Sequence, residues 1–421
     1  MSHTAYNLSP EFLEELQQRI SRLVESAAPS EIFGNLFNGF NGIPTREQLA
    51  YIIDAAFWTS FSRDEDNAVT ISIILNRAEE SFDTFLFDRP IPFDVRNLVK
   101  LGAALENPRA DICVWPNEGE ELTIWGFKTR SRDTIIANLW IQALGPGRIL
   151  ITFGGKSIGA LISNEAVFVD HSNLMRAIIP KLSLTSGEQT DNNLRLLRYN
   201  SLLTTARAMC AHNRGGTLLA VPDSDQWRRS IDSPVPYTGG ASFLESDYDV
   251  TQKPSLITPV AEFLSALVKT KKTNEREKLF KVRDQIEQQC RHIARLTAVD
   301  GALAMTFDRF VFCFGAKIIL AEGQTPPSSI RVFKPVEGDP GRTISLTELG
   351  GTRHQSAAQF AHAQPGSVAV VVSQDGDVTF FTTDLPSNEL IAVQQAELAV
   401  LHEGLGAAIW NYSRLAEMGY S

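Results

Sequence analysis

Apolar residues spaced three and four positions apart dominate the first hundred residues of the chain. In the first such stretch, Ser9-Pro10-Glu11 combines an N-cap, a proline suited to the first helical position and an early acid. The same spacing predicts helices from Thr45 to Phe61 and from Val95 to Leu105, and alternation over Val69 to Leu75 predicts a strand between them. Residues 1–105 are therefore expected to be mainly helical.

Between residues 110 and 170 the pattern changes to the period of β-strands. Turn sequences at Asn117-Glu118-Gly119 and Gly145-Pro146-Gly147 separate the apolar runs, which predicts an antiparallel meander. The predicted strands are Asp111–Trp115, Leu122–Phe127, Ile135–Ala143, Arg148–Phe153 and Ala166–Val169. Some aromatic residues here either line a ligand pocket or, as is more common, belong to the core. They are Trp115, Trp125, Phe127 and Trp140.

A polar stretch without periodicity, Ser183 to Asn193, predicts a linker, and we place the domain boundary after residue 188. The proline- and glycine-rich stretch Gly323 to Arg342 predicts an inserted loop. Leu390 to Trp410 predicts a closing amphipathic helix.

Composition narrows the class of protein. The chain has 421 residues, of which 43% are hydrophobic, enough for two or three domains with packed cores. Its 39 basic and 49 acidic residues give a net charge of −10, which disfavours nucleic acid as a partner but is compatible with a small basic pocket for nucleotide phosphates. The charge run Lys269 to Lys278 lacks interleaved aromatic residues, so we interpret it as a solvated helix start or loop.

Cysteine usage and apolar runs indicate the compartment. The four cysteines lie far apart without a Cys-x-x-Cys pair, which argues against a zinc site and against a disulfide framework. We find no signal peptide and no apolar run of about 18 residues. The sequence therefore predicts a soluble, cytoplasmic protein that has no membrane partner.

Candidate chemistry lies in three short motifs of the second half. Asp300-Gly301-Ala302 stands where a helix-like segment leads into a strand, a usual place for a metal-binding or base-forming acid. Gly351-Thr352-Arg353-His354 precedes a helix, so a hydroxyl, free backbone N–H groups, a guanidinium and an imidazole gather where an anion binds well. The apolar run Val368 to Val372 predicts a buried strand that delivers Ser373 and Asp375 at its C-terminal end.

Each motif also has a plain structural interpretation. Asp-Gly-Ala is commonly a turn, and a Thr-Arg-His triplet is more often a helix cap with a solvated arginine than a phosphate site. Their order and context carry more information, because together they resemble the signatures of the diadenylate cyclase (DAC) domain: Asp-Gly-Ala, Gly-Thr-Arg-His-Arg and a strand ending in Ser-Glu-Glu. The resemblance extends upstream, where Leu194–Cys210 looks like the leading helix of this domain and Arg214–Val221 is similar to its first, glycine-led strand.

The resemblance implies a fold. It implies an α/β domain over residues 189–386, with a mixed sheet flanked by helices, and a C-terminal helix within residues 387–421 that packs on this domain. The α+β module ahead of it, residues 1–188, resembles the sensor domains that accompany such cyclases, and its ligand is unknown. The chain as a whole is thus expected to be of the α+β class.

The resemblance also implies an activity, the condensation of two ATP molecules into cyclic di-AMP with release of two pyrophosphates. Asp300 and Asp375 match the family's metal-binding acids, with Mg²⁺ or Mn²⁺ as the cation, and Asp300 also helps to activate the attacking 3′-hydroxyl. Because each monomer supplies one ATP, the family implies a homo-oligomer with face-to-face sites. The residues assigned to nucleotide binding are Gly301, Ala302, Gly351, Thr352, Arg353, His354, Gln355 and Ser373.

Two departures from the family pattern define an alternative. Asp375 stands where the family usually has the longer glutamate, and Gln355 stands where the motif has its second arginine. The loss of one charged phosphate contact costs on the order of 1.5–3 kcal/mol. The alternative function is a nucleotide-binding module that senses ATP or a related nucleotide without cyclising it, and a partner-binding scaffold is a third possibility.

Overall fold

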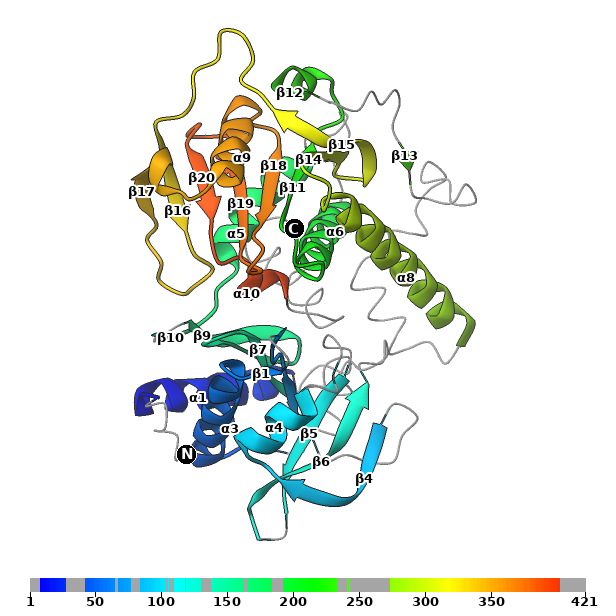
Figure 1. Cartoon of the computed structure of the whole chain (residues 1–421), viewed down its shortest axis with the longest axis vertical. Helices are drawn as coiled ribbons and strands as arrows, with labels where there is room; N and C mark the ends of the chain where they lie inside the picture. Colours follow the sequence, from blue (N-terminus) through cyan, green and yellow to red (C-terminus); the bar gives the residue numbers. More distant parts are fainter. Residues whose placement is uncertain are drawn as a thin grey trace. The chain divides into compact units, whose positions relative to one another are not determined.

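The computed structural model describes residues 8–27, 42–64, 67–76, 84–102, 105, 110–117, 119–129, 138–162, 165–183, 192–232, 241–242 and 273–401. These residues form two compact units, one within Met1–Val169 and the other within Asp170–Leu401 (Figure 1). Each unit contains a mixed β-sheet flanked by helices, so the expected α+β class is confirmed.

The helices of the first unit follow the predicted pattern. They are α1 (Pro10–Ala27), α3 (Arg46–Ser60) and α4 (Val95–Gly102). Thr45 caps α3 through a capping box with Gln48, which satisfies two backbone N–H groups that the first turn leaves free. Leu16 and Ile20 of α1 are fully buried, as their helical spacing predicts.

The sheet of the first unit is mostly antiparallel. Its strand β3 (Ser72–Leu75) runs parallel to β5 (Ala110–Pro116) and antiparallel to β7 (Leu139–Gly145). The predicted meander is therefore interrupted, because β3 lies between β5 and β7. The remaining strands are β4 (Thr84–Pro92), β6 (Leu122–Thr129), β8 (Arg148–Phe153), β9 (Lys156–Ile162) and β10 (Glu165–Val167), in the order β10-β9-β8-β7-β3-β5-β6-β4. A separate two-stranded pair joins β1 (Arg63–Asp64) to β2 (Asn67–Ala68).

Strand β4 contains two prolines, Pro90 and Pro92. A proline cannot donate to a neighbouring strand, so it is tolerated on an edge strand and seldom in the middle of a sheet. In the described part of the sheet β4 is the last strand, and its only neighbour is β6.

The two faces of this sheet differ in character. One face, which we call the helix face, carries Ile73, Ile112 and Ile141 and packs with residues of α1, α3 and α4 in one apolar cluster. The opposite face carries several polar side chains of which at most 8% is exposed. We call it the polar face and define it by Ser72, Asp111, Asn138, Gln142, Thr152 and Ser157.

The sheet of the second unit is larger and also mixed. Its strands lie in the order β12-β15-β14-β11-β18-β19-β20-β16-β17, and β13 (Ala241–Ser242) pairs with β15. The bounds are β11 (Gly216–Val221), β12 (Ile231–Asp232), β14 (Ala302–Thr306), β15 (Phe310–Ile318), β16 (Ser329–Phe333), β17 (Arg342–Ser345), β18 (Val368–Val372), β19 (Val378–Thr383) and β20 (Leu390–Val393).

The second sheet is apolar on both faces. In β11, Leu218 and Ala220 join the cluster that contains residues of α6 (Asn192–Cys210) and α8 (Thr273–Leu296), whereas Leu219 and Val221 join the cluster that contains α9 (Thr352–Ala363). Burial on both faces explains why the central strands are continuous apolar runs. Short helices complete the unit: α5 (Ser172–Ile178), η1 (Ile179–Ser183), η2 (Gln226–Ser230), η3 (Leu346–Glu348) and α10 (Glu397–Val400).

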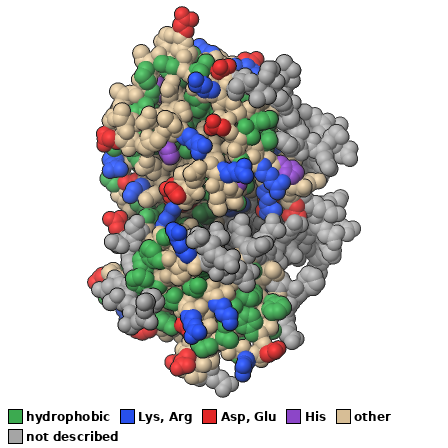
Figure 2. Space-filling view, viewed as in Figure 1, with side chains coloured by type: hydrophobic (Ala, Val, Ile, Leu, Met, Phe, Trp, Pro, Cys, Tyr) green, Lys and Arg blue, Asp and Glu red, His purple; other side chains and the backbone are tan. Residues whose placement is uncertain are grey.

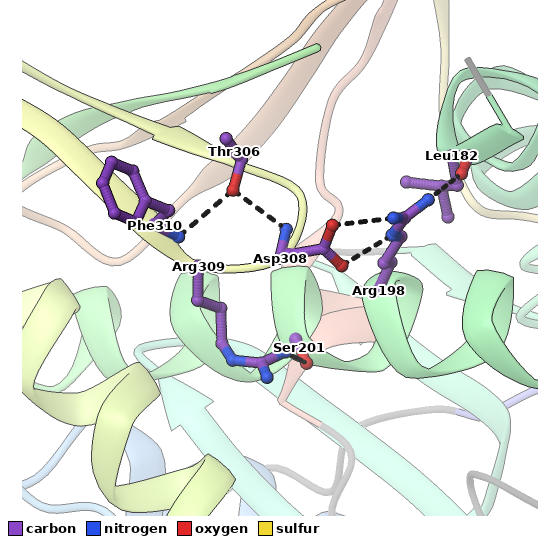
Figure 3. A network of polar contacts seen from close by, with 7 residues as sticks. All are labelled: Leu182, Arg198, Ser201, Thr306, Asp308, Arg309 and Phe310. Atoms are coloured by element: carbon purple, nitrogen blue, oxygen red, sulfur yellow. Dashed lines mark hydrogen bonds and ion pairs between the residues drawn. The ribbon is translucent and has the colours of Figure 1, made fainter. Parts of the chain in front are cut away.

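The turn between β14 and β15 is fastened to α6 by two arginines (Figure 3). Arg198 of α6 contacts both carboxylate oxygens of Asp308, at 2.8 and 2.7 Å, and donates to the Leu182 carbonyl at 2.7 Å. Arg309 comes from the turn itself, where its φ is +69°, and donates to the Ser201 hydroxyl at 2.8 Å. These bonds tie the C-terminal end of β14 to α6, and Asp300 precedes the other end of the same strand.

Two predicted segments differ from the structure. Residues 323–342 were expected to be an inserted loop, but they contain β16 and the start of β17, which pair with each other at the border of the second sheet. The predicted helix Leu390–Trp410 is wrong at its start, because Leu390–Val393 forms β20 between β19 and β16, and helical structure begins only with α10 at Glu397. The rest of that predicted helix, beyond residue 401, lies outside the described residues.

The division between the units falls at Val169 and Asp170, upstream of the predicted linker. Helix α5 follows the division, and its Leu174 and Ile178 are fully buried in the same cluster as α6. Most of the predicted linker lies outside the described residues.

On the face shown in Figure 2, basic and acidic side chains lie interspersed among apolar ones. Among the helices that the structure describes, none is both long enough and apolar enough to span a bilayer.

Candidate active site

Three sequence motifs meet on one edge of the second sheet. Strand β14 runs parallel to β11, with Ala302 beside Thr217, and β18 runs antiparallel to β11, with Val371 beside Thr217. Thr379 of β19 pairs with Val371 in turn. The starts of β11, β14 and β19 and the end of β18 therefore lie side by side, and we call this border the motif edge.

Asp300 lies in the short connection from α8 to β14, as its sequence position predicts, and its side chain is exposed. The following Gly301 has a φ of +110°, and a Cβ placed on it would lie 2.5 Å from the carbonyl carbon of Gly315. Only glycine fits such a close approach without a shift of the backbone. Gly301 and the buried Ala302 thus set the path of the chain, and they leave the carboxylate of Asp300 on the motif edge.

The second motif forms the N-terminus of α9, as predicted. Gly351 is the N-cap residue, and no side chain caps this end of the helix. The first backbone N–H groups of a helix have no partner within it, and the helix dipole adds positive potential there. The exposed Thr352 and Arg353 follow directly, so this end of α9 is suited to hold an anion.

The Arg353 guanidinium lies against the backbone at the start of β11. A Cβ placed on Gly215 would be 2.7 Å from Arg353 Nη1 and 3.0 Å from the Val372 carbonyl oxygen. Gly215 also has a φ of +67°. In the part of the chain that the structure describes, Arg353 forms no ion pair, so its charge is available to a ligand.

His354 points back over the sheet, where its Nε2 lies 3.4 Å from the Thr379 hydroxyl. Its ring also contacts Phe381 edge-on, with 6.0 Å between ring centroids. Burial lowers the pKa of His354, and the nearby Asp377 carboxylate partly opposes this effect. At neutral pH the imidazole is therefore uncharged, and it acts as a hydrogen-bonding group of the edge and not as a fixed cation.

The third motif forms the turn between β18 and β19. The Ser373 hydroxyl accepts a hydrogen bond from the Asp377 backbone N–H at 3.0 Å, and Ser373 N–H donates to the Asp377 carbonyl at 2.9 Å. A hydroxyl that accepts one bond still has its own proton to donate, which is compatible with a phosphate contact. The turn places Asp375 at its exposed tip, beyond the end of β18.

Gln355, the residue that departs from the family motif, turns toward the backbone. Its Nε2 donates to the Gly350 carbonyl at 3.1 Å, five residues earlier. The amide therefore tightens the loop that enters α9. It does not replace the missing cation at the motif edge.

The sequence motifs did not include Arg214 and His212, which also lie at this edge. Arg214 directly precedes Gly215, is exposed, and forms no ion pair in the described structure. The His212 ring accepts from the Arg214 backbone N–H and lies 3.2 Å from the Thr297 hydroxyl. Burial, followed by the charge of Arg214, lowers the pKa of His212. The feature of the sequence that could have identified Arg214 as a site residue is its position directly before the glycines that begin a strand.

The donor set fits a hard cation that a nucleotide helps to hold. Asp300 and Asp375 share the motif edge, and the strands next to them, β14 and β18, are two positions apart in the sheet, about 10 Å at the usual strand spacing. Within the described residues, no group of three or more His, Cys, Asp or Glu side chains could hold a metal by itself. Mg²⁺ is usually bound by one or two carboxylates together with phosphates of a ligand, and Asp300 and Asp375 are carboxylates of this kind.

Comparison with known proteins concerns the first unit. Residues 39–129, from ahead of α3 to the end of β6, match the family described as Probable sensor domain DACNV. The match confirms in coarse form the predicted sensor domain, of a kind that accompanies diadenylate cyclase domains. No curated protein matches the chain, and no solved structure does. For the second unit, the resemblance to the cyclase rests on its own residues.

Proposed function

We propose that this chain is a diadenylate cyclase whose second unit condenses ATP into cyclic di-AMP and whose first unit senses a regulatory ligand. The observation that carries the proposal is the meeting of Asp300, the N-terminus of α9 and Asp375 on the motif edge. These segments are far apart in the sequence. A sensor domain of the cyclase-associated kind in the first unit gives independent support.

Each half of the reaction is a phosphoryl-type transfer. A 3′-hydroxyl oxygen of one ATP forms a bond to the α-phosphorus of the other, and the bond from that phosphorus to the bridging oxygen of the β-phosphate breaks. Asp300 accepts the hydroxyl proton, and pyrophosphate leaves with the electrons of the broken bond. Two such steps consume two ATP and close the ring.

The remaining residues of the motif edge bind and orient. Arg353 and Arg214 neutralise phosphate oxygens, and the free N–H groups of α9 and the Ser373 hydroxyl add hydrogen bonds. Asp300 and Asp375 would hold Mg²⁺ or Mn²⁺, which when bound spreads the negative charge of the phosphates.

The reaction requires two chains. The described chain has one set of motifs and therefore binds one ATP, and the second phosphodiester bond needs a second site that faces the first. We therefore expect a homo-oligomer, at least a transient one, in which two motif edges face each other.

A product assay tests the proposal. Purified full-length protein is incubated with ATP and Mg²⁺ or Mn²⁺ across a dilution series, and the products are separated by chromatography. We expect cyclic di-AMP and pyrophosphate in a ratio of one to two, with an activity per protomer that rises with protein concentration. Lack of cyclic di-AMP with both cations at every concentration would refute the cyclase.

The orientation of Gln355 favours one alternative, a module that binds ATP and does not cyclise it. The motif edge lacks the second arginine of the family motif, and Gln355 is engaged with the Gly350 carbonyl. This alternative predicts ATP binding by calorimetry without product. The same protein preparation therefore distinguishes the two functions.

A further inference from the structure

The polar face of the first sheet contains buried groups that the helix face does not. Ser72, Asp111 and Gln142 form a row across β3, β5 and β7. Ser72 pairs with Gln142 on one side. On the other side it lies beside Asp111, because the next residues of the two parallel strands, Ile73 and Ile112, are partners. Their exposed fractions are 1%, 2% and 8%. The same face also carries the buried apolar side chains of Ile74, Cys113 and Leu150, which belong to none of the apolar clusters formed by the described residues.

Asn138 is the most telling of these residues. It is fully buried, and among the described residues neither its Oδ1 nor its Nδ2 has a hydrogen-bond partner. Thr152, with 4% exposed, likewise has an unpartnered hydroxyl. A buried polar group without a partner costs about 1–3 kcal/mol, and native proteins rarely retain one without a reason. Two such residues on one face indicate that a ligand forms the hydrogen bonds which the protein itself does not supply.

The unpartnered groups lie around one tryptophan. Trp140 stands two residues after Asn138 on β7, so their side chains project from the same face, and Thr152 is its partner on β8. The Trp140 indole is held in place by Asp111, whose Oδ2 accepts from Nε1 at 3.1 Å. Trp115 lies on the same face by alternation with Val114, whereas Phe127 packs against the core of the helix face. An aromatic ring of fixed orientation thus lies beside a free carboxamide and a free hydroxyl.

These groups select a type of ligand. An asparagine carboxamide presents a donor next to an acceptor, which is the pattern that pairs with the edge of a nucleobase or of a cyclic amide. An indole held at one angle offers a surface on which a planar ring can stack, and binding sites commonly combine aromatic walls with a few placed polar groups.

We propose that Asn138, Trp140 and Thr152, supported by Asp111, form the ligand site of the first unit and bind a small, uncharged planar ring with adjacent hydrogen-bond donor and acceptor, as in a nucleobase or nicotinamide. Asn138, Trp140 and Thr152 lie beyond the residues matched by the sensor-domain family, so that match assigns them no role. The inference does not depend on the cyclase, since it would hold even if the second unit formed no product.

The test uses full-length protein and four named probes: adenosine, guanosine, uridine and nicotinamide. Binding is measured by calorimetry, and the midpoint of thermal unfolding is measured in parallel, for wild type, Asn138→Leu and Thr152→Val. At least one probe should bind wild type and raise its midpoint, with an affinity at least tenfold weaker in both variants. Without ligand, both variants should remain folded, because each replaces an unpaired polar group by an apolar one of similar size.

Two controls locate the site. Thr123→Val removes a hydroxyl that is already bonded, to the Trp115 carbonyl at 3.0 Å, and should leave binding unchanged. Asn138→Leu should leave the affinity for ATP unchanged while it weakens binding of the probe, which distinguishes this site from the proposed ATP site. If no probe binds, the buried groups are satisfied by ordered water only and the proposal is wrong. Equal affinity in wild type and Asn138→Leu would refute it as well.

Discussion

The two sheets of this protein use their surfaces in opposite ways. The second sheet is covered by apolar clusters on both faces, and its candidate chemistry lies on an edge, where loops and a helix N-terminus come together. Among the described residues, the first sheet has an apolar cluster on its helix face only, and the other face mixes buried polar groups with a few buried apolar ones. An edge exposes backbone ends and turns that suit charged phosphates, whereas a sheet face offers side chains at fixed spacing that suit a neutral ring.

The two sheets should therefore tolerate substitutions at different places. On the second sheet, substitutions in the interior should affect stability, and substitutions on the motif edge should affect chemistry. On the first sheet, stability should depend on the helix face and ligand binding on the polar face.

The largest expected effect is on the motif edge. Asp300→Asn should keep the fold and the metal-free affinity for ATP but reduce cyclic di-AMP formation by about 10²–10⁴-fold, because an amide is neither a base nor an anionic metal ligand. Product is measured by chromatography under saturating ATP. The control is Asp223→Asn, an exposed carboxylate that follows the opposite end of β11. Wild-type turnover by Asp300→Asn would remove Asp300 from the mechanism.

The next effect contrasts the interiors of the two units. Phe360 of α9 is fully buried in the cluster between α9 and the second sheet, so Phe360→Ala should lower the free energy of unfolding by about 3–5 kcal/mol. Thr152→Val, on the polar face, should not lower it and should raise it by up to about 1–3 kcal/mol, because the change removes a hydroxyl that is buried without a partner. Denaturant titration measures both values. Similar losses for the two variants would mean that the polar face is an ordinary core.

A third effect concerns the cations of the motif edge. Arg353→Gln and Arg214→Gln should each weaken ATP binding by about 10- to 100-fold, since a charge-assisted phosphate contact contributes about 1.5–3 kcal/mol. Each change should also reduce the salt dependence of binding. Arg342→Gln, at an exposed position on β17, is the matched control. If Arg214→Gln behaves like this control, Arg214 makes no contact with the phosphates.

The smallest effect depends on pH. Burial keeps His354 neutral in the folded chain at pH values where the unfolded chain, with a pKa near 6.5, already binds a proton. The free energy of unfolding should therefore fall as pH drops below about 6.5, and the fall should end once both states are protonated. His354→Gln should make this decline shallower. The free energy of unfolding is measured by denaturant titration at several pH values between about 7.5 and 5. An unchanged slope would show that His354 is not the titrating group, and His212→Gln would then be examined, because burial lowers its pKa as well.

Much of the motif edge could be predicted from local patterns. The Asp300 connection, the start of α9 at Thr352 and the buried strand Val368–Val372 were all predicted, because each depends on residues close in sequence. The same local reasoning failed at Leu390–Val393, where an apolar run is compatible with either helix or strand. There the segment became a strand because it pairs with β19.

By itself, the sequence determined which residues alternate, which cap a helix and in what order the motifs occur. Only the tertiary structure decided that β18 runs antiparallel to β11, which brings its C-terminal end, and with it Asp375, to the side where β11 and β14 begin. It alone also showed that Asn138 and Thr152 are buried without partners. The reason is physical: periodicity reports how a residue faces within its own element, whereas strand pairing and polar satisfaction depend on atoms contributed by distant parts of the chain.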